Sequence, residues 1–89
     1  MRQVRTTGQF ERDYSHMVKR GKKIDKLDSV MWMLINEVPL PPRCRDHALK
    51  GNLTGFRDCH IEPDWLLIYK VDGDSVVFER TGTHSDIFR

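Results

Sequence analysis

The proline-rich segment Pro39-Leu40-Pro41-Pro42 divides the sequence into two parts with different patterns of apolar residues. Before it, apolar residues recur every three or four positions, as on one face of a helix. From Gly55 onward the chain carries short runs of β-branched and aromatic residues without a helical period. This order predicts an α+β fold in which an N-terminal helical hairpin packs on a small twisted antiparallel β-sheet.

The first part predicts two helices. A weak strand signal over residues 3–5 precedes a helix that begins near Thr6, because a glutamine follows this threonine at the spacing of a capping box, and that runs to Arg20. The second helix is predicted over residues 23–37 and ends before Pro39, which disfavours helical geometry in the residue preceding it.

The second part predicts three antiparallel strands, over residues 56–61, 65–71 and 75–81, after a polar loop over residues 43–54. The strands are joined by two turns, at Pro63-Asp64 and at Asp72-Gly73. The middle strand begins with a run that is apolar on both faces, so the sheet is expected to be covered on both sides of this strand.

Length and composition favour one small folded domain over residues 1–89. The 89 residues are 38% hydrophobic and 31% charged, which is typical of a soluble folded chain. We find no apolar run long enough to span a membrane and no secretory signal, so a cytoplasmic protein without membrane contact is expected. The two cysteines, Cys44 and Cys59, fit that compartment as free thiols, because small secreted domains usually carry more bridges.

The predicted strand directions bring several polar residues to one edge of the sheet. In a three-strand meander the first and third strands are parallel, so His60 and the residues from Arg80 to His84 end at the same edge. The turn that holds Asp64 lies at that edge as well. His47, in the preceding loop, could fold over the same edge, although nothing local directs it there.

Histidines beside a carboxylate have the chemistry required to cleave RNA without a metal ion. An imidazole exchanges protons near neutral pH, so one such group could deprotonate a ribose 2′-hydroxyl while another protonates the departing 5′-oxygen. A cation such as Arg80 could stabilise the phosphorane, and Phe88 could stack on a base.

Structural explanations compete with the catalytic one. Asp64 could serve only the turn, and Arg80 could pair with Glu62 or Asp86. A zinc site is a further alternative, with four potential ligands: Cys44, His47, Cys59 and His60. Adjacent residues on a strand point to opposite faces, however, so Cys59 and His60 do not easily reach one ion.

The order of motifs resembles the YafQ branch of the RelE-type bacterial toxins over nearly the whole chain. The motifs are Asp46-His47-x-Leu49-x-Gly51, Gly55-x-Arg57-Asp58-x-His60-x-Glu62-Pro63-Asp64-Trp65, Arg80-Thr81-Gly82-Thr83-His84, and Phe88. The resemblance implies a type II toxin that cuts mRNA in the ribosomal A site by 2′-hydroxyl attack, without metal or other cofactor. It implies three partners: mRNA, the ribosome with its rRNA, and a cognate antitoxin that neutralises the toxin.

By this resemblance, the family's catalytic positions correspond to His47, His60, Asp64, His84 and Phe88. We expect Asp64 and His84 to form the acid and base pair, while His47 and His60 orient the substrate or stabilise the phosphorane. Arg80 is a weaker helper. An aspartate acts as a base only if burial raises its pKa, and otherwise it holds a histidine in the required tautomer.

Two other functions remain open from the sequence. A ParE-like relative would inhibit DNA gyrase by binding, but binding alone requires no proton-transfer groups. A regulatory protein with structural histidines would depend on its helices for contact with a partner. Residues 1–53 contain eleven Lys and Arg against six Asp and Glu, whereas residues 54–89 contain four against seven. The positive first part is therefore expected to attract an acidic antitoxin segment.

Overall fold

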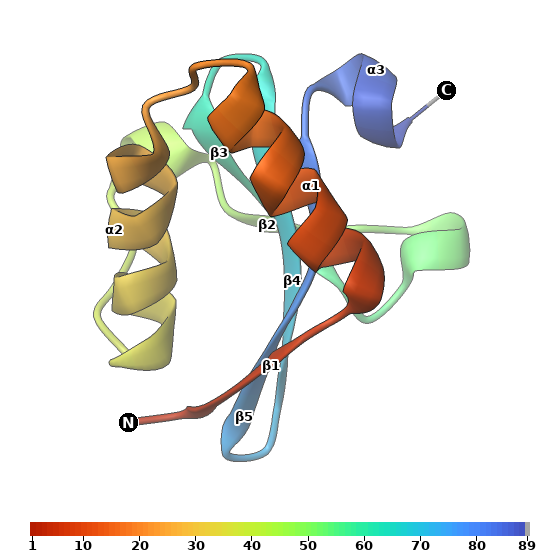
Figure 1. Cartoon of the computed structure of the whole chain (residues 1–89). Coiled ribbons are helices and arrows are strands. Elements are labelled where there is room, and N and C mark those ends of the chain that lie inside the picture. Colours follow the sequence, from red (N-terminus) through yellow and green to blue (C-terminus); the bar gives the residue numbers. More distant parts are fainter. Residues whose placement is uncertain (89) are drawn as a thin grey trace.

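The computed structural model describes residues 1–88, which form a five-stranded sheet with two longer helices on one face (Figure 1). The helices are α1 (Gly8–Lys19), α2 (Ile24–Ile35) and the short α3 (His84–Ile87). The strands are β1 (Gln3–Thr6), β2 (His47–Ala48), β3 (Arg57–Glu62), β4 (Trp65–Asp72) and β5 (Ser75–Gly82). The 3-10 turns η1 (Pro42–Cys44) and η2 (Gly51–Leu53) flank β2. The predicted α+β class is confirmed.

The strands lie in the order β1-β5-β4-β3-β2. The meander of β3, β4 and β5 is antiparallel, and each predicted strand is confirmed to within one residue at either end. The sheet is mixed because β1 pairs with β5 in parallel. The loop predicted over residues 43–54 contains the two-residue strand β2, which pairs with the start of β3.

The first helix is capped one residue later than the sequence indicated. Thr6 belongs to β1 and pairs with Phe78, so it is not available as a cap. The Thr7 hydroxyl instead accepts a hydrogen bond from the backbone N–H of Phe10 at 2.9 Å and donates one to the Glu79 carbonyl at 2.8 Å. The predicted capping box at Thr6 is therefore wrong, and Thr7 fixes the start of α1 against β5.

The second helix ends at Ile35, two residues earlier than predicted. A helix that continued through Pro39 would place the proline ring against the carbonyl of Ile35, and Glu37 adopts a left-handed φ of 61°. Arg2 satisfies carbonyls at this end, since its backbone N–H reaches the Ile35 oxygen and its guanidinium reaches the Leu34 oxygen, both at 2.7 Å. The N-terminal residues thus cap α2.

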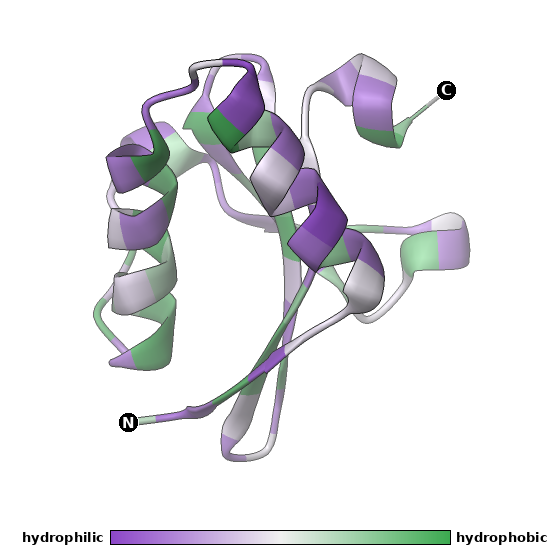
Figure 2. Cartoon of the chain, viewed as in Figure 1, coloured by the Kyte–Doolittle hydropathy of each residue, from purple (hydrophilic) through white to green (hydrophobic). Residues whose placement is uncertain are grey.

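The core lies between the two longer helices and the central strands. Apolar residues lie on the sides of the two helices that face the sheet (Figure 2). Its largest members come from α1, α2, β4 and β5: Phe10, Met17, Leu27, Val30, Leu34, Trp65, Leu67, Tyr69, Val76 and Phe78. Leu66 and Ile68 are also fully buried, on the opposite face of β4. The predicted burial of both faces of this strand is confirmed.

Cys44 and Cys59 are buried free thiols, as expected. Within residues 1–88, no helix has the length and apolar character needed to cross a membrane.

Candidate active site

Asp64 and His84 meet where the β3–β4 turn approaches the end of β5. An oxygen of the Asp64 carboxylate, Oδ1, accepts a hydrogen bond from the backbone N–H of His84 at 3.0 Å and lies 2.5 Å from His84 Nδ1. These two contacts hold the Asp64 pKa below its ordinary value, and the hydrogen bond from the backbone has the larger effect. Asp64 is therefore ionised at neutral pH and orients the His84 ring, whereas it is poorly suited to act as a base.

His60 lies beside this pair. Its ring centroid is 5.9 Å from that of His84, and the two rings are tilted by 44°. His60 pairs with Leu66 across β3 and β4, which places its ring on the face of the sheet opposite the helices. Its Nδ1 is buried and has no hydrogen-bond partner among the described residues. Two imidazoles thus lie close enough to contact one phosphate group.

Asp58 belongs to the candidate site, although no sequence pattern indicated it. It lies two residues before His60 on the same face of β3 and is only 4% exposed, with Oδ1 unpartnered in the described chain. Burial raises the pKa of its carboxyl, while the charges of His47, His60 and His84 act to lower it. The two-residue spacing from His60 indicates a shared face of the strand, but the sequence does not show that this aspartate is buried.

His47 reaches the same face through β2. In the strand register His47 lies opposite Asp58, and His47 Nε2 is 3.8 Å from Asp58 Oδ2. The preceding Asp46 fixes this strand, since it accepts hydrogen bonds from the Tyr69 hydroxyl at 2.6 Å and from Arg57 Nε at 3.1 Å. The structure therefore brings His47 to the edge by contacts of Asp46 that were not apparent from the sequence.

Arg80 is occupied by a partner on α1. Its Nε donates to Asp13 Oδ2 at 2.7 Å, and its Nη2 donates to Asp13 Oδ1 at 3.3 Å and to the Asp86 carbonyl at 3.4 Å. Asp13 is itself buried and also accepts from the backbone N–H of Thr81 at 3.2 Å. Arg80 thus connects α1, β5 and α3, and its carboxylate partner is neither Glu62 nor Asp86.

A dense set of contacts positions α3, which carries His84. Thr83 and Asp86 form a capping box, and Arg20 donates to both Asp86 oxygens, at 2.7 and 3.0 Å. A Cβ added to Gly82 would lie 2.9 Å from the Asp86 Cβ, so this approach requires glycine. These contacts set the place of His84 at the end of β5.

Phe88 ends α3 one turn after His84. Its backbone N–H donates to the His84 carbonyl at 2.7 Å, and 42% of the residue is exposed. An exposed aromatic ring four residues after His84 offers a surface on which a base can stack.

The four potential zinc ligands are not gathered in one place. Cys44 and Cys59 lie in the apolar core, whereas His60 lies on the opposite face. Among residues 1–88, no three His, Cys, Asp or Glu side chains are grouped as metal ligands would be.

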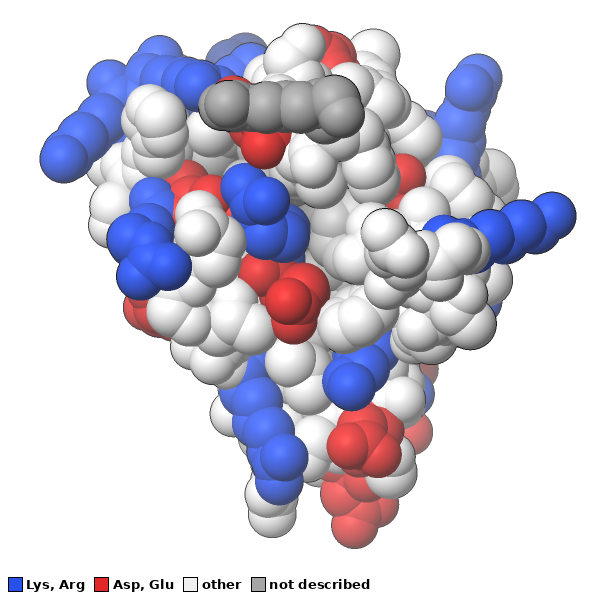
Figure 3. All heavy atoms as spheres, turned by 90° about the vertical axis from the view of Figure 1, so that its right-hand side faces the viewer, with Lys and Arg blue, Asp and Glu red and all other residues white. Residues whose placement is uncertain are grey.

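The surface around η2 and the end of α3 carries charges of both signs. Figure 3 shows Lys and Arg side chains interspersed with Asp and Glu on this side of the molecule. The positive charge of the first part of the sequence therefore does not form one continuous patch on this face.

Comparison with known proteins places the chain among bacterial toxins. The family model described as "Bacterial toxin of type II toxin-antitoxin system, YafQ" matches residues 2–89. The mRNA interferase toxin YafQ of Escherichia coli K12 is 46% identical over 88 residues, which cover 98% of this chain and 96% of that protein.

Solved structures agree with this result. The crystal structure of YafQ from E. coli strain BL21(DE3) has a TM-score of 0.95 and 43% identity, with each chain covered completely. YafQ in the crystal structure of the E. coli DinJ-YafQ toxin-antitoxin complex has a TM-score of 0.92 and 45% identity, with 99% of this chain and 98% of that chain covered.

Proposed function

Because this chain belongs to the YafQ family of toxins of bacterial type II toxin–antitoxin systems, we propose that it cuts mRNA in the A site of the ribosome. Like the mRNA interferases that it resembles, the chain is an endoribonuclease toxin. The reaction is an attack by a ribose 2′-hydroxyl on the adjacent phosphorus, with acid and base supplied by the protein and no cofactor. We assign this reaction to one domain, residues 1–89, acting in the cytoplasm.

The contact between Asp64 and His84 beside His60 is the observation that carries the proposal. With Asp64 bound at Nδ1, the imidazole of His84 exchanges protons with substrate through Nε2. His60 supplies the second proton-transfer group, 5.9 Å away between ring centroids. This arrangement supports His84 and His60 as the acid and base pair, with Asp64 as the residue that orients His84. A positioned acid or base contributes about 10²- to 10⁴-fold to the rate.

The remaining site residues act on charge and position. Protonated His47, held near Asp58, would offset the negative charge that develops on the phosphorane. Phe88 would stack on a base of the mRNA and align the ribose beside His84. Arg80 is assigned an indirect role, because its guanidinium is held by Asp13 and supports α3.

A cognate antitoxin is the proposed protein partner. The E. coli YafQ structure that this chain resembles was solved as a complex with DinJ. An acidic segment of such an antitoxin would be attracted to the lysines and arginines that predominate in residues 1–53.

The test compares free mRNA with mRNA on translating ribosomes, and maps new RNA ends after addition of purified protein. We expect cuts in the A-site codon of ribosome-bound message only. His84→Gln should reduce the single-turnover rate by about 10²-fold or more, because it removes a proton-transfer group. His16→Gln is the matched control, since His16 is exposed on α1.

Two results would contradict the proposal. Absence of new RNA ends together with inhibition of DNA gyrase would indicate a ParE-like activity. Growth arrest that persists in His84→Gln and Asp64→Asn variants, with the fold intact, would show that the histidine site does not cause toxicity.

A further inference from the structure

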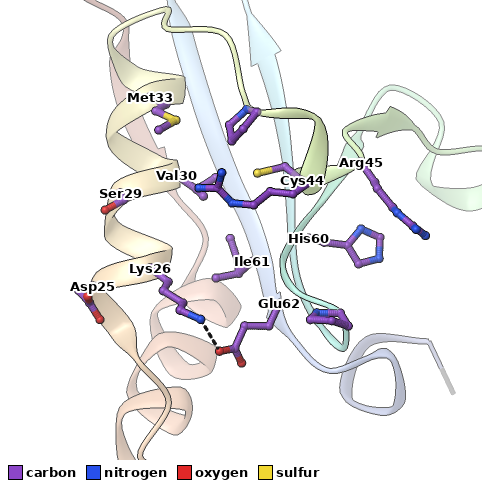
Figure 4. A pocket seen from close by; sticks show the side chains of 13 residues that line it. Asp25, Lys26, Ser29, Val30, Met33, Cys44, Arg45, His60, Ile61 and Glu62 are labelled. Carbon is purple, nitrogen blue, oxygen red and sulfur yellow. Dashed lines mark hydrogen bonds and ion pairs between the residues drawn. The ribbon is translucent and has the colours of Figure 1, made fainter.

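A cavity of about 640 Å³ lies between α2 and η1, next to the candidate active site (Figure 4). Its volume is in the range of pockets that hold small molecules. The residues that matter for its chemistry are Lys26, Met33, Arg43, Arg45, His60 and Ile61.

The cavity connects the two faces of the sheet at the open edge of β3. The strand β2 pairs only with Arg57 and Asp58, so it leaves the later part of that edge uncovered. In Figure 4, Ile61 points toward α2, whereas His60 points to the other side of β3, where Arg45 also lies. A chain that contacts His60 can therefore continue around this edge into the cavity beside α2.

The charges at this edge suit a phosphate backbone. Arg43 and Arg45 are exposed and make no ion pair within residues 1–88, so both guanidinium groups are available to a ligand. Lys26 adds a third positive charge, although it is shared with Glu62 at 3.1 Å. Unpaired guanidinium groups bind phosphate through paired hydrogen bonds.

The wall of the cavity suits the ring of a base. Val30 and Met33 of α2 face Ile61 of β3 across it, and Pro41 and Cys44 add apolar surface. An apolar slot with cations at its mouth resembles the way in which proteins hold single-stranded RNA, with bases against apolar or aromatic surfaces and phosphates against Arg and Lys.

We infer that this cavity binds a nucleotide of the substrate RNA next to the cut, with its base between Met33 and Ile61 and its phosphate on Arg43 and Arg45. This inference rests on the proposed nuclease function and adds a second recognition site to it. The position of the cations at the margin shared with His60 favours RNA over a protein segment as the occupant.

The test is a titration of the whole protein with a trinucleotide RNA that carries 2′-O-methyl ribose at each position and so cannot supply the attacking hydroxyl. Amide chemical shifts report where it binds. We expect shifts at Met33 and Ile61 as well as at His84. Arg43→Glu and Arg45→Glu should each weaken binding by about tenfold or more, because each loses a charged hydrogen bond.

Two further variants complete the design. Arg5→Glu is the matched charge control, because Arg5 lies in β1 at the opposite edge of the sheet. The affinity of this variant for the RNA should stay near that of the unaltered protein. Ser29→Trp places a large ring in the cavity from the exposed side of α2 and should abolish the shift at Ile61 while that at His84 persists.

Cleavage of ribosome-bound mRNA by the same proteins separates the two proposals. Two outcomes, each accompanied by cleavage, would overturn the inference and leave the nuclease function in place. In the first, the RNA shifts the amides of Asp64 and His84 alone. In the second, both arginine variants bind the RNA as tightly as the unaltered protein. Absence of both RNA binding and cleavage would overturn both. Shifts at Met33 and Ile61 caused by the antitoxin from the adjacent gene, and not by RNA, would assign the cavity to a protein partner.

Discussion

Asp58 is a buried carboxyl group on which two opposing effects act. Its burial disfavours the ionised form, while His47, His60 and His84 favour it. Such a residue lowers the stability of the folded state in exchange for a property of the site, a pattern that is common at active sites.

Asp58→Asn is therefore expected to stabilise the protein at pH 7 and to lower its activity. A raised pKa means that the contribution of Asp58 to stability is complete below the ordinary Asp pKa and is lost as the pH rises through the raised value. The free energy of unfolding should exceed that of the unaltered protein at pH 7 and approach it near pH 3, as measured by denaturant titration. Cleavage should fall by about tenfold or more, because the histidines lose a nearby negative charge. Lower stability at pH 7 would contradict this account.

Asp64→Asn tests whether Asp64 orients His84. The amide cannot accept through its nitrogen and favours the wrong imidazole tautomer, so the single-turnover cleavage rate should fall by about 10²-fold or more. Asp74→Asn is the matched control, because Asp74 lies in the exposed β4–β5 turn. Equal rates for the two variants would show that the contact with His84 has no catalytic consequence.

The positions of single residues were predictable where strand direction alone determines them. His60, Asp64 and His84 meet because the meander brings their strand ends to one edge, and this could be inferred from the sequence. Asp58 was missed because burial of a polar residue cannot be deduced from its identity. Arg80 was expected either to act as a cation at the site or to pair with Glu62 or Asp86. Its actual partner, Asp13, lies 67 positions away on a helix and was not apparent from the sequence.

Among the elements, α3 is the one whose placement most directly affects the candidate site, because it carries His84 and is followed directly by Phe88. It has four residues and no buried side chain, so packing alone does not hold it. The pair of Arg20 and Asp86 supplies the missing attachment, and the hydrogen bonds from Arg20 hold the Asp86 pKa well below its ordinary value.

Arg20→Ala should detach α3 while leaving the rest of the fold in place. We expect faster hydrogen exchange at the amide of Phe88, a loss of cleavage of about tenfold, and little change in the melting temperature, because an exposed ion pair adds little to global stability. Arg20→Lys should recover part of the activity.

The same pair predicts how α3 responds to acid. Because the Asp86 pKa is depressed, the ionised Asp86 stabilises the attachment of α3 above the ordinary Asp pKa. This stabilisation is lost as the pH falls through the pKa of Asp86 in the folded protein. In acid, the Phe88 amide of the unaltered protein should therefore exchange as fast as that of Arg20→Ala. If the Phe88 amide exchanged equally slowly in the unaltered protein and in Arg20→Ala at neutral pH, the role of this pair would be contradicted.

The long elements and the short strand β1 were indicated by the sequence, whereas β2 and α3 were not. The two longer helices and β3, β4 and β5 follow from periodicity and turn residues, with ends displaced by one or two positions. β2 has two residues and α3 has four, too few for any period to be recognised. Both are held by distant side chains, namely Asp46 with Tyr69 and Asp86 with Arg20, and such contacts leave no local pattern in a sequence.

At the scale of the whole molecule, the two thiols report on the integrity of the core. Cys44 and Cys59 are almost fully buried, and burial raises the pKa of both.

Alkylation by iodoacetamide at pH 8 should therefore be slow in the folded protein and should accelerate with denaturant along the same curve as tryptophan fluorescence. The rate ratio between unfolded and folded protein should be about 10³ or more, if exposure of the thiols requires global unfolding. Rapid labelling of Cys44→Ser in native buffer would show that Cys59 becomes accessible by local opening, and would contradict this expectation.

The overall arrangement was predictable in its class and in its layers. Helical periodicity before Pro39 and strand patterning after Gly55 were sufficient for the α+β class, and the fully apolar start of β4 indicated a central strand. The parallel pairing of β1 with β5 was not predictable, because nothing in four exposed residues specifies which edge they join.

The order in which the chain supplies its parts has a genetic consequence. Phe78 is the last residue of the hydrophobic core along the chain, and His84 and Phe88 follow it. A stop codon or a frameshift after the codon for Gly82 would thus yield a chain that contains every core residue but lacks His84 and Phe88. Under the proposed function, such a chain would fold but would not cleave mRNA.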